Sequence, residues 1–206
     1  MHQGYGRARL GRILGNDAQL PDKTNQTDAL LRQLADGNRG ALDQLWVLHG
    51  GAIHGIGMRF LGTADAGEDV LQEAFVKIWQ NAHRFDPNRG TGTAWIFTIV
   101  RNVARDHLRR QRLRWLVGLD ALVTEPVDTA PDQTVQADDR AKLRQVQAEM
   151  LDLPDRQRMA LLLSATAGLD THEIATIMGS SQGAVEQLIV RARRHLRARM
   201  KETGHE

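Results

Sequence analysis

Apolar residues recur every three or four positions along most of this chain, and that spacing places them on one face of an α-helix. The clearest case is DAGEDVLQEAFVKIWQNAHRF, residues 65–85, which Asp65 is expected to cap at its start. Its apolar stripe consists of Val70, Leu71, Ala74, Phe75 and Ile78. No segment alternates apolar and polar residues as a half-buried β-strand does. The pattern therefore predicts an all-α protein.

Two further helices are predicted before this one. Thr27 is the expected N-cap of DALLRQLADG, and RGALDQLWVLHGGAIHGIGMRFLG forms the next helix. The glycines of the run GGAIHGIG each cost on the order of 1 kcal/mol of helix propensity, a cost that close packing against another helix would offset. The apolar stripe of this helix is expected to contain Leu42, Leu45, Trp46, Leu48 or His49, Ile53 and Ile56.

The segment GTAWIFTIVRNVARDHLRRQRLR, residues 92–114, changes character along its length. The apolar residues of its first half lie at helical spacing, so this half is predicted to be buried. They are Trp95, Ile96, Ile99 and Val103. Only Asp106 opposes the arginines that follow, which are Arg101, Arg105, Arg109, Arg110, Arg112 and Arg114. The first half is expected to hold this helix in its domain, and the second half to meet phosphate. The preceding DPNRGTG is predicted to be a loop.

The chain has 206 residues and a hydrophobic fraction of 41%, which suits one compact domain or two small ones. Residues 116–135 hold two prolines and several acids without a helical period, as linkers do. We therefore predict two small helical domains joined by a flexible acidic linker. The predicted division is a flexible tail over 1–26, a first domain over 27–114, the linker over 115–135, a second domain over 136–200 and a tail over 201–206.

The net charge of +2 conceals an uneven distribution. Residues 101–114 hold six arginines and one aspartate, and residues 191–201 hold six basic residues and no acid. Residues 116–139 between them hold six acids and no basic residue. Two basic segments separated by an acidic one predict two contact surfaces for a polyanion. The alternative for each basic segment is an ordinary solvated arginine face.

The block GLDTHEIATIMGSSQGAVEQLIVRARRHLR, residues 168–197, has the layout of a helix-turn-helix. Thr171 is expected to cap a short helix, and Gly179 to supply the left-handed turn that ends it. Ser180 or Ser181 is expected to cap the second helix. The predicted inward residues of that helix are Ala184, Val185, Leu188, Ile189 and Ala192. A helical hairpin that binds protein is the alternative reading.

In a helix-turn-helix, the start of the second helix faces base edges in the major groove. The base-facing candidates by position are Ser181, Gln182, Gly183, Glu186 and Gln187. A glutamine reads adenine with two hydrogen bonds, and a glutamate accepts one from the cytosine amino group. Arg191 and Arg194 follow along the same helix, where phosphates would pass. Phosphate contacts position a protein but read no sequence.

Two ordered blocks make the chain resemble bacterial sigma factors of the extracytoplasmic-function (ECF) group, two-domain members of the sigma-70 family. The first block is EDVLQEAFVKIWQNAHRFDP followed by TAWIFTIVRNVARDHLRR, and the second is LPDRQRMALLL followed by the helix-turn-helix. With the weaker ALLRQLADGNRGALDQLW, the match spans about residues 27–114 and 136–200. The resemblance implies a subunit that directs core RNA polymerase to specific promoters in a stress or environmental response. It also implies promoter DNA and an anti-sigma factor as partners.

The resemblance also implies roles for individual residues. The family docks its EDVLQEAF helix on core polymerase, which implies contacts by Asp69, Gln72, Glu73 and Lys77. The following loop and helix bind the minus-ten element as a single strand, which implies roles for Phe85, Asn88, Arg89, Trp95, Asn102, Arg105, Asp106, Arg109 and Arg110. Trp95 is either a stacking platform or a core anchor, and its spacing from Ile99 favours the anchor. The minus-thirty-five element is assigned to Ser181, Gln182, Gly183, Glu186, Gln187, Arg191 and Arg194.

The recognition helix departs from the family pattern. Family members often have Thr-Val-Lys-Ser-Arg where this chain has AVEQL, residues 184–188. The family's basic residues are lost there, and Glu186 would repel phosphate. Promoter specificity therefore cannot be copied from relatives.

Several classes of protein are excluded or disfavoured. The chain has no cysteine, so disulfides and cysteine-based zinc sites are excluded, which fits a cytoplasmic protein. The sequence contains no run of 18 apolar residues and no signal-peptide pattern, so neither membrane insertion nor export is predicted. THEIAT lacks the second histidine of a zinc-protease helix, and no phosphate loop or nucleophile elbow is present. We therefore expect no enzyme, no metal and no cofactor.

Two other functions stay open. A stand-alone helix-turn-helix regulator would bind duplex DNA tightly without polymerase. A sigma-like decoy would bind an anti-sigma factor and would lack basic charge on its DNA helices. The arginine-rich segments at residues 101–114 and 191–201 argue against the decoy.

Overall fold

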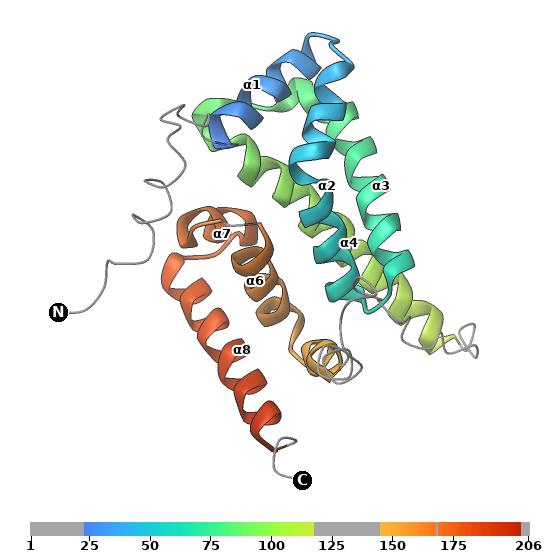
Figure 1. The fold of residues 1–206 in the computed structure, drawn as a ribbon, viewed down its shortest axis with the longest axis vertical. Helices are drawn as coiled ribbons and strands as arrows, with labels where there is room; N and C mark the ends of the chain where they lie inside the picture. Colours follow the sequence, from blue (N-terminus) through green and yellow to red (C-terminus); the bar gives the residue numbers. More distant parts are fainter. Residues whose placement is uncertain (1–22, 118–144, 168, 203–206) are drawn as a thin grey trace, which may run out of the picture.

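The computed structural model describes residues 23–117, 145–167 and 169–202, and the regular elements within these ranges are all helical (Figure 1). The first domain contains α1 (Lys23–Ala35), α2 (Gly40–Leu61), α3 (Ala64–Asn81), the 3-10 turns η1 (Ala82–Arg84) and η2 (Pro87–Arg89), and α4 (Gly92–Leu116). The second contains a helical segment over 145–151, α6 (Asp155–Thr166), α7 (Thr171–Met178) and α8 (Gln182–Glu202). The expected all-α fold with two helical domains is confirmed. The predicted tails and linker lie largely outside the described residues.

The start of α1 differs from the prediction. The helix begins at Lys23, so Thr27 lies inside it and does not cap it. Thr27 is fully buried, and its Oγ1 shares a hydrogen bond of 2.9 Å with Nε2 of His49 in α2. A buried hydroxyl needs such a partner. Thr27 therefore joins α1 to α2 instead of starting a helix.

Two other helix starts also lie slightly before the predicted caps. Thr63, not Asp65, caps α3, and its hydroxyl accepts a hydrogen bond of 3.2 Å from a first-turn N–H. Asp170, not Thr171, caps α7 through a capping box with Glu173. In both cases the residue with extended backbone just outside the helix is the cap, because only that geometry aims its oxygen at the free N–H groups.

The glycines of α2 allow a close approach to α3, as the sequence suggested. A Cβ atom added to Gly57 would lie 2.9 Å from Cβ of Val70 and 3.0 Å from Cα of Gly67. A Cβ atom added to Gly67 would lie 3.0 Å from the carbonyl oxygen of His54. These distances leave no room for a side chain at either glycine. The contact between the two backbones thus offsets the helix propensity that the glycines forfeit.

The first half of α4 is buried, as predicted, although the register differs by one residue. The fully buried side chains include Ile96, Phe97, Val100, Val103 and Ala104. Trp95 and Ile99 are only half-buried at the edge of this stripe. The N-terminus of α4 is held from two sides: Oγ1 of Thr91 accepts from the Ala94 N–H (3.1 Å), and Asp28 of α1 accepts from the Gly92 N–H (2.6 Å).

The two domains lie against each other. Figure 1 shows α6 and α7 beside α2 and α4, and α8 on the far side of α6. The buried apolar side chains of both domains form one continuous cluster. The sequence predicted two tethered bodies but gave no signal for this contact. This contact between the domains places the second domain next to α4, the helix that carries the arginines.

Gly67→Ala should destabilise the protein, because its methyl group must push α2 and α3 apart. We expect a loss of about 1–3 kcal/mol in the free energy of unfolding, measured by urea denaturation followed by circular dichroism. Gly51→Ala is the matched control, since Gly51 is an exposed residue of α2 with nothing within 4 Å of its added Cβ. This control should gain about 0.5–1 kcal/mol from helix propensity. Equal effects of the two substitutions would refute the close-packing role.

Candidate nucleic-acid interface

A pocket of about 290 Å³ lies between the loop that precedes α4 and the first turns of that helix. Phe85 and Trp95 both line it and pack against each other in a tilted arrangement, with ring centroids 6.0 Å apart. Trp95 packs against the hydrophobic core, as its spacing favoured, and also lines the pocket. The complete lining is Arg84, Phe85, Asp86, Arg89, Gly90, Thr91, Ala94, Trp95, Thr98 and Thr176.

The rim of this pocket is held in shape by its own turn. Oδ1 of Asp86 accepts hydrogen bonds from the backbone N–H (2.9 Å) and the side-chain Nδ2 (3.0 Å) of Asn88. Gly90 has φ of 141°, a backbone conformation that other residues rarely adopt. Arg89 is exposed beside it. Of the predicted loop residues, Phe85 and Arg89 therefore line the pocket, while Asn88 stabilises its rim.

A basic track continues from the pocket along α4. Asn102, Arg105 and Arg109 follow Thr98 at successive turns of the same face and are exposed. The Arg109 side chain is 75% exposed and lies 3.7 Å from Asp106, its acidic neighbour. An ion pair this exposed contributes little and leaves the guanidinium available. Asn102, Arg105 and Arg109 thus continue the surface of the pocket, whereas Arg110, another predicted minus-ten residue, lies beside Glu73 of α3.

Glu73 is the one predicted polymerase contact that points elsewhere. Its Oε2 lies 2.7 Å from Nε2 of His107 and 3.4 Å from Nη1 of Arg110, both in α4, and its Oε1 lies 2.9 Å from Lys77. Partial burial alone would raise the pKa of Glu73, but hydrogen bonds from Lys77 and His107 outweigh it and lower this pKa to about 2. Glu73 therefore ties α3 to the arginine-bearing helix.

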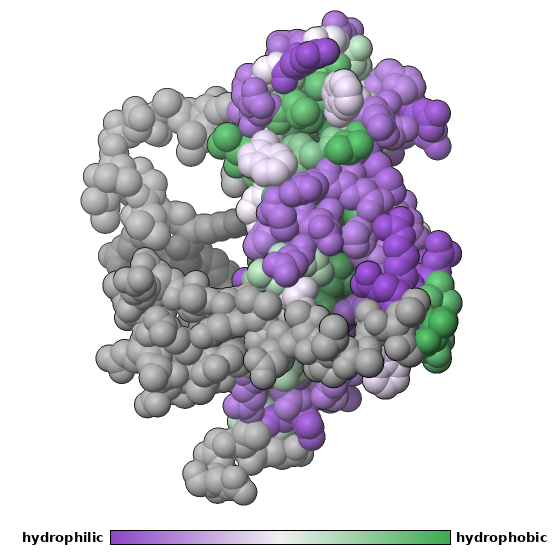
Figure 2. All heavy atoms as spheres, turned by 90° about the vertical axis from the view of Figure 1, so that its right-hand side faces the viewer, coloured by the Kyte–Doolittle hydropathy of each residue, from purple (hydrophilic) through white to green (hydrophobic). Residues whose placement is uncertain are grey.

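The rest of the predicted docking helix presents a mixed face. Asp69 and Gln72 are exposed on α3. Beside them the structure reveals an apolar patch that the sequence analysis missed, made by Trp46, Val76 and Trp79, which are 42%, 49% and 51% exposed. Figure 2 shows residues of hydrophobic (green) and intermediate (white) hydropathy among hydrophilic ones (purple) on the upper part of the face turned to the viewer.

The spacing of Gln72, Val76 and Trp79 was a usable sequence signal for this patch. It places them on one stripe, separate from the buried stripe. Trp46 was assigned to the core stripe of α2 and is instead half exposed, and its ring packs at a tilt on that of Phe75 with ring centroids 4.7 Å apart.

The helix-turn-helix has the predicted geometry. Gly179 ends α7 with φ of 58°, and Oγ of Ser181 accepts from the Ala184 N–H (3.3 Å) at the start of α8. Val185, Ile189 and Ala192 are buried as expected and Leu188 is half-buried, whereas Ala184, also predicted to face inward, is exposed. The predicted base- and phosphate-facing residues are all exposed: Ser181, Gln182, Gly183, Glu186, Gln187, Arg191 and Arg194.

The comparisons with known proteins agree with this geometry. The chain matches the family models Sigma-70 region 2 over residues 45–114 and Sigma-70, region 4 over residues 143–196. It is 30% identical to the ECF RNA polymerase sigma factor SigL of Mycobacterium tuberculosis over 156 residues, 76% of this chain and 86% of SigL. It is 34% identical to the sigma factor CnrH of Cupriavidus metallidurans over 177 residues, 82% of this chain and 91% of CnrH. The chain belongs to the ECF RNA polymerase sigma factors.

Solved structures of sigma factors share this arrangement. CnrH in complex with the cytosolic domain of CnrY matches with a TM-score of 0.66 and 29% identity, over 86% of this chain and 98% of CnrH. The sigma factor RpoE in complex with the anti-sigma factor NepR, from Bartonella quintana, matches with a TM-score of 0.64 and 26% identity, over 77% of this chain and 96% of RpoE. The region 2 match contains the pocket and α4, and the region 4 match contains most of the helix-turn-helix.

Two further observations concern the described residues of this sigma factor. Within them, no three His, Cys, Asp or Glu side chains gather in a group that could hold a metal ion. None of the helices described here combines the length and the apolar character that a membrane span requires.

Glu73→Gln should destabilise this sigma factor near neutral pH. The folded-state pKa of about 2 lies below the ordinary 4.5, so the ionised carboxylate contributes stability above pH 4.5, and the contribution is lost as the pH falls toward 2. We expect a loss of about 1 kcal/mol near neutral pH, since the pair is partly exposed. Urea unfolding as a function of pH measures it.

The difference between Glu73→Gln and the wild type should shrink below pH 4.5. Glu68→Gln on the same helix is the matched control, because Glu68 is exposed and accepts a hydrogen bond from the neutral side chain of Gln72 (2.9 Å). A pH-independent loss in Glu73→Gln would contradict the ionic role.

Proposed function

We propose that this sigma factor docks on core RNA polymerase through α3, holds an unpaired promoter base in the pocket before α4, and reads duplex DNA with the start of α8. The observation that carries the proposal is the continuity of the pocket with the basic track. A strand whose base enters the pocket would lay its phosphates along Asn102, Arg105 and Arg109. Trp95 would form one wall against which the base stacks.

The polymerase-docking role of α3 is supported by the apolar patch beside Asp69 and Gln72. Exposed aromatic residues surrounded by polar ones are typical of protein interfaces. We propose that Trp46, Val76 and Trp79 supply most of the affinity for polymerase, and that Asp69, Gln72 and Lys77 set the orientation. Glu73 contributes indirectly, by holding α4 in place behind this face.

The role of α8 is supported by the exposure of its first two turns. Gln182, Glu186 and Gln187 carry groups that recognise base edges, and Arg191 and Arg194 lie further along, where the DNA backbone passes. Glu186 disfavours a phosphate contact and favours a cytosine amino group. We propose that these residues recognise the minus-thirty-five element.

We further propose that an anti-sigma factor regulates this chain in the cytoplasm. The solved relatives that match both domains were determined with CnrY and with the anti-sigma factor NepR, which supports such a partner. We assign no catalytic group to the chain itself, because the chemistry of RNA synthesis belongs to the polymerase. A role in a stress or environmental response stays a prediction.

Transcription in vitro tests the proposed function. Purified core polymerase is supplied with a library of randomised promoters, with and without this protein, and the transcripts are sequenced. We expect specific initiation only when the protein is added. A stand-alone regulator would instead bind a duplex site equally well without polymerase. A decoy would neither bind DNA nor support initiation.

Arg109→Ala should weaken binding of a premelted promoter fragment by the polymerase complex. Each phosphate contact to a single strand contributes a slope of about −0.7 in a plot of log affinity against log salt. We expect this variant to reduce the slope by about 0.7 and to bind several-fold more weakly at low salt. Arg32→Ala removes an exposed arginine from α1 and should leave the slope unchanged. An unaltered slope in Arg109→Ala would remove it from the track.

Gln182→Ala and Arg194→Ala should have different effects on promoter recognition: the first on base preference, the second on overall affinity. We propose that Gln182 faces base edges, so its removal should relax the base preference at one position of the upstream element. The expected loss is about 1–3 kcal/mol of discrimination between the preferred base and the others. We propose that Arg194 faces phosphate, so its removal should weaken binding to all promoter sequences by the same factor. Transcription from a library randomised only in the upstream element measures both. If Gln182→Ala shows the wild-type base preference, α8 does not read DNA as proposed.

A further inference from the structure

We infer that α6 and α7 form an intramolecular cover over the promoter-melting face of α4, so that the chain by itself holds its minus-ten site shut until the domains part. The inference rests on the proposed function, because the covered surface is the one that we propose binds the unpaired strand. The competing ligand is the chain's own second domain. Four contacts at this interface place a group of α6 or α7 against α4 or the base pocket, and a fifth holds the two domains together.

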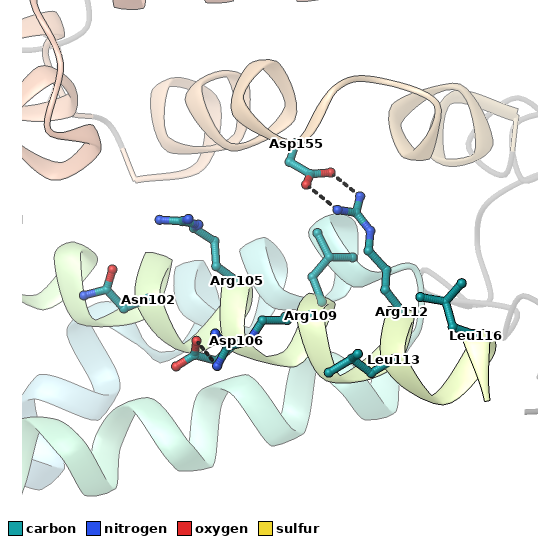
Figure 3. Close-up of a pocket in the computed structure, with 9 residues that line it drawn as sticks. Asn102, Arg105, Asp106, Arg109, Arg112, Leu113, Leu116 and Asp155 are labelled. Carbon is teal, nitrogen blue, oxygen red and sulfur yellow. Dashed lines mark hydrogen bonds and ion pairs between the residues drawn. The ribbon is translucent and has the colours of Figure 1, made fainter. Parts of the chain in front are cut away.

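The central contact is a two-point ion pair (Figure 3). Arg112 in the basic half of α4 donates from Nη1 and Nη2 to the two carboxylate oxygens of Asp155, at 2.9 and 2.8 Å. Arginine binds phosphate with the same fork of two parallel hydrogen bonds. Asp155, the first residue of α6, therefore occupies Arg112 as a DNA phosphate would.

The cover reaches the other end of the melting face as well. Arg101 donates from Nη1 to the carbonyl oxygen of Ile177 in α7. Thr91, at the rim of the base pocket, donates from Oγ1 to Oε1 of Glu173 (2.9 Å). Thr176, also in α7, lines the base pocket itself. A strand entering this pocket would displace α7.

A buried arginine holds the two domains together. Arg158 of α6 is 4% exposed, and its guanidinium carbon lies 5.3 Å from the centroid of the Phe60 ring. Its Nη1 donates to the carbonyl oxygen of Phe60 in α2 (2.6 Å), and its Nη2 donates to those of Leu151 (2.8 Å) and Leu153 (3.1 Å). One charged group thus satisfies acceptors from both domains, which favours the closed arrangement.

The same interface has features that favour opening. Arg156 of α6 shares a cavity of about 330 Å³ with Arg101 and Arg105 of α4, so like charges meet across it. A second cavity of about 630 Å³ lies beside the Arg112 pair, between α4 and α6 (Figure 3). Cavities and like charges make an interface weaker than a packed core. A ligand that binds only the open form can therefore shift the population toward it.

A reversible cross-link tests the cover. A Cβ atom at Gly55 in α2 would lie 3.7 Å from Cγ2 of Thr166 in α6, which is ordinary van der Waals contact, so these two positions adjoin across the domain interface and are candidates for a disulfide. The Arg59 guanidinium lies 2.6 Å from the same position, at the end of a flexible side chain that can move. The chain has no native cysteine, so within one chain Gly55→Cys with Thr166→Cys can form only this disulfide.

We expect the oxidised double variant, mixed with core polymerase, to initiate from a promoter selected with the wild type roughly tenfold less than after reduction with dithiothreitol. The single-cysteine variants and the wild type, treated identically, control for substitution and reductant. Equal initiation by both forms, with the disulfide confirmed by mass spectrometry, would overturn the cover. Failure of the wild type at every promoter would instead refute the proposed function, so the two failures are distinguishable.

A second variant tests the cover without a cross-link. Asp155→Asn removes the charge facing Arg112 and leaves the arginines of α4 intact. We expect the free full-length chain to bind a single-stranded oligonucleotide of the selected minus-ten sequence several-fold more tightly, by fluorescence anisotropy. Asp152→Asn is the control, because Asp152 makes no ion pair with α4 in the part of the chain that the structure describes. Equal affinities of the two variants would show that Asp155 does not compete with DNA.

Discussion

The burial of the first half of α4 is the constraint on which the other features depend. Ile96, Phe97 and Val100 fix this half in the core, and Thr91 and Asp28 fix its N-terminus. Since an α-helix is rigid over this length, the arginines of the second half emerge at set positions relative to the pocket. The same arginines on a flexible segment would attract a polyanion without orienting it. One helix thus supplies both a wall of the pocket that we propose holds a base and the arginines that we propose follow the strand away from it.

Glu73 extends this constraint to the docking face. It accepts from His107 and lies near Arg110, so α3 and α4 are joined by charged contacts as well as by apolar packing. The side of α3 that carries Asp69, Gln72 and the exposed tryptophans therefore keeps a fixed relation to the DNA track. A domain built this way can transmit its position on the polymerase to the strand it holds without any internal rearrangement. Glu73, which the sequence analysis predicted as a direct polymerase contact, is engaged by Lys77, His107 and Arg110 within the domain, and its contact with polymerase stays a prediction.

The sequence predicted the features that depend on local spacing and missed those that depend on tertiary contacts. The helices, the buried half of α4 and the turn at Gly179 follow from periodicity and from one special backbone conformation. The caps of α3 and α7 were placed one or two residues too late, because neighbouring Thr and Asp residues have equal capping propensity until the backbone selects one. The predicted cap of α1, Thr27, lies well inside a helix that begins at Lys23. The exposure of Trp46 could not be predicted, since an aromatic ring on an apolar stripe suits either a core or an interface. The pairing of Arg112 with Asp155 joins residues 43 apart, and no sequence pattern links them.

The closed arrangement bears on how a basic protein avoids binding DNA indiscriminately. Affinity for random DNA comes mainly from releasing counterions on phosphate contact, so every accessible arginine adds to it. In the closed chain Asp155 neutralises Arg112, and the Ile177 carbonyl oxygen occupies Arg101, so the melting face presents less unpaired charge than its composition implies. The exposed arginines of α8 remain for duplex DNA, which alone gives weak, salt-sensitive binding. Strong binding then requires the domains to separate. Specificity arises because promoter contacts by the two domains must compensate together for the loss of the interface between them.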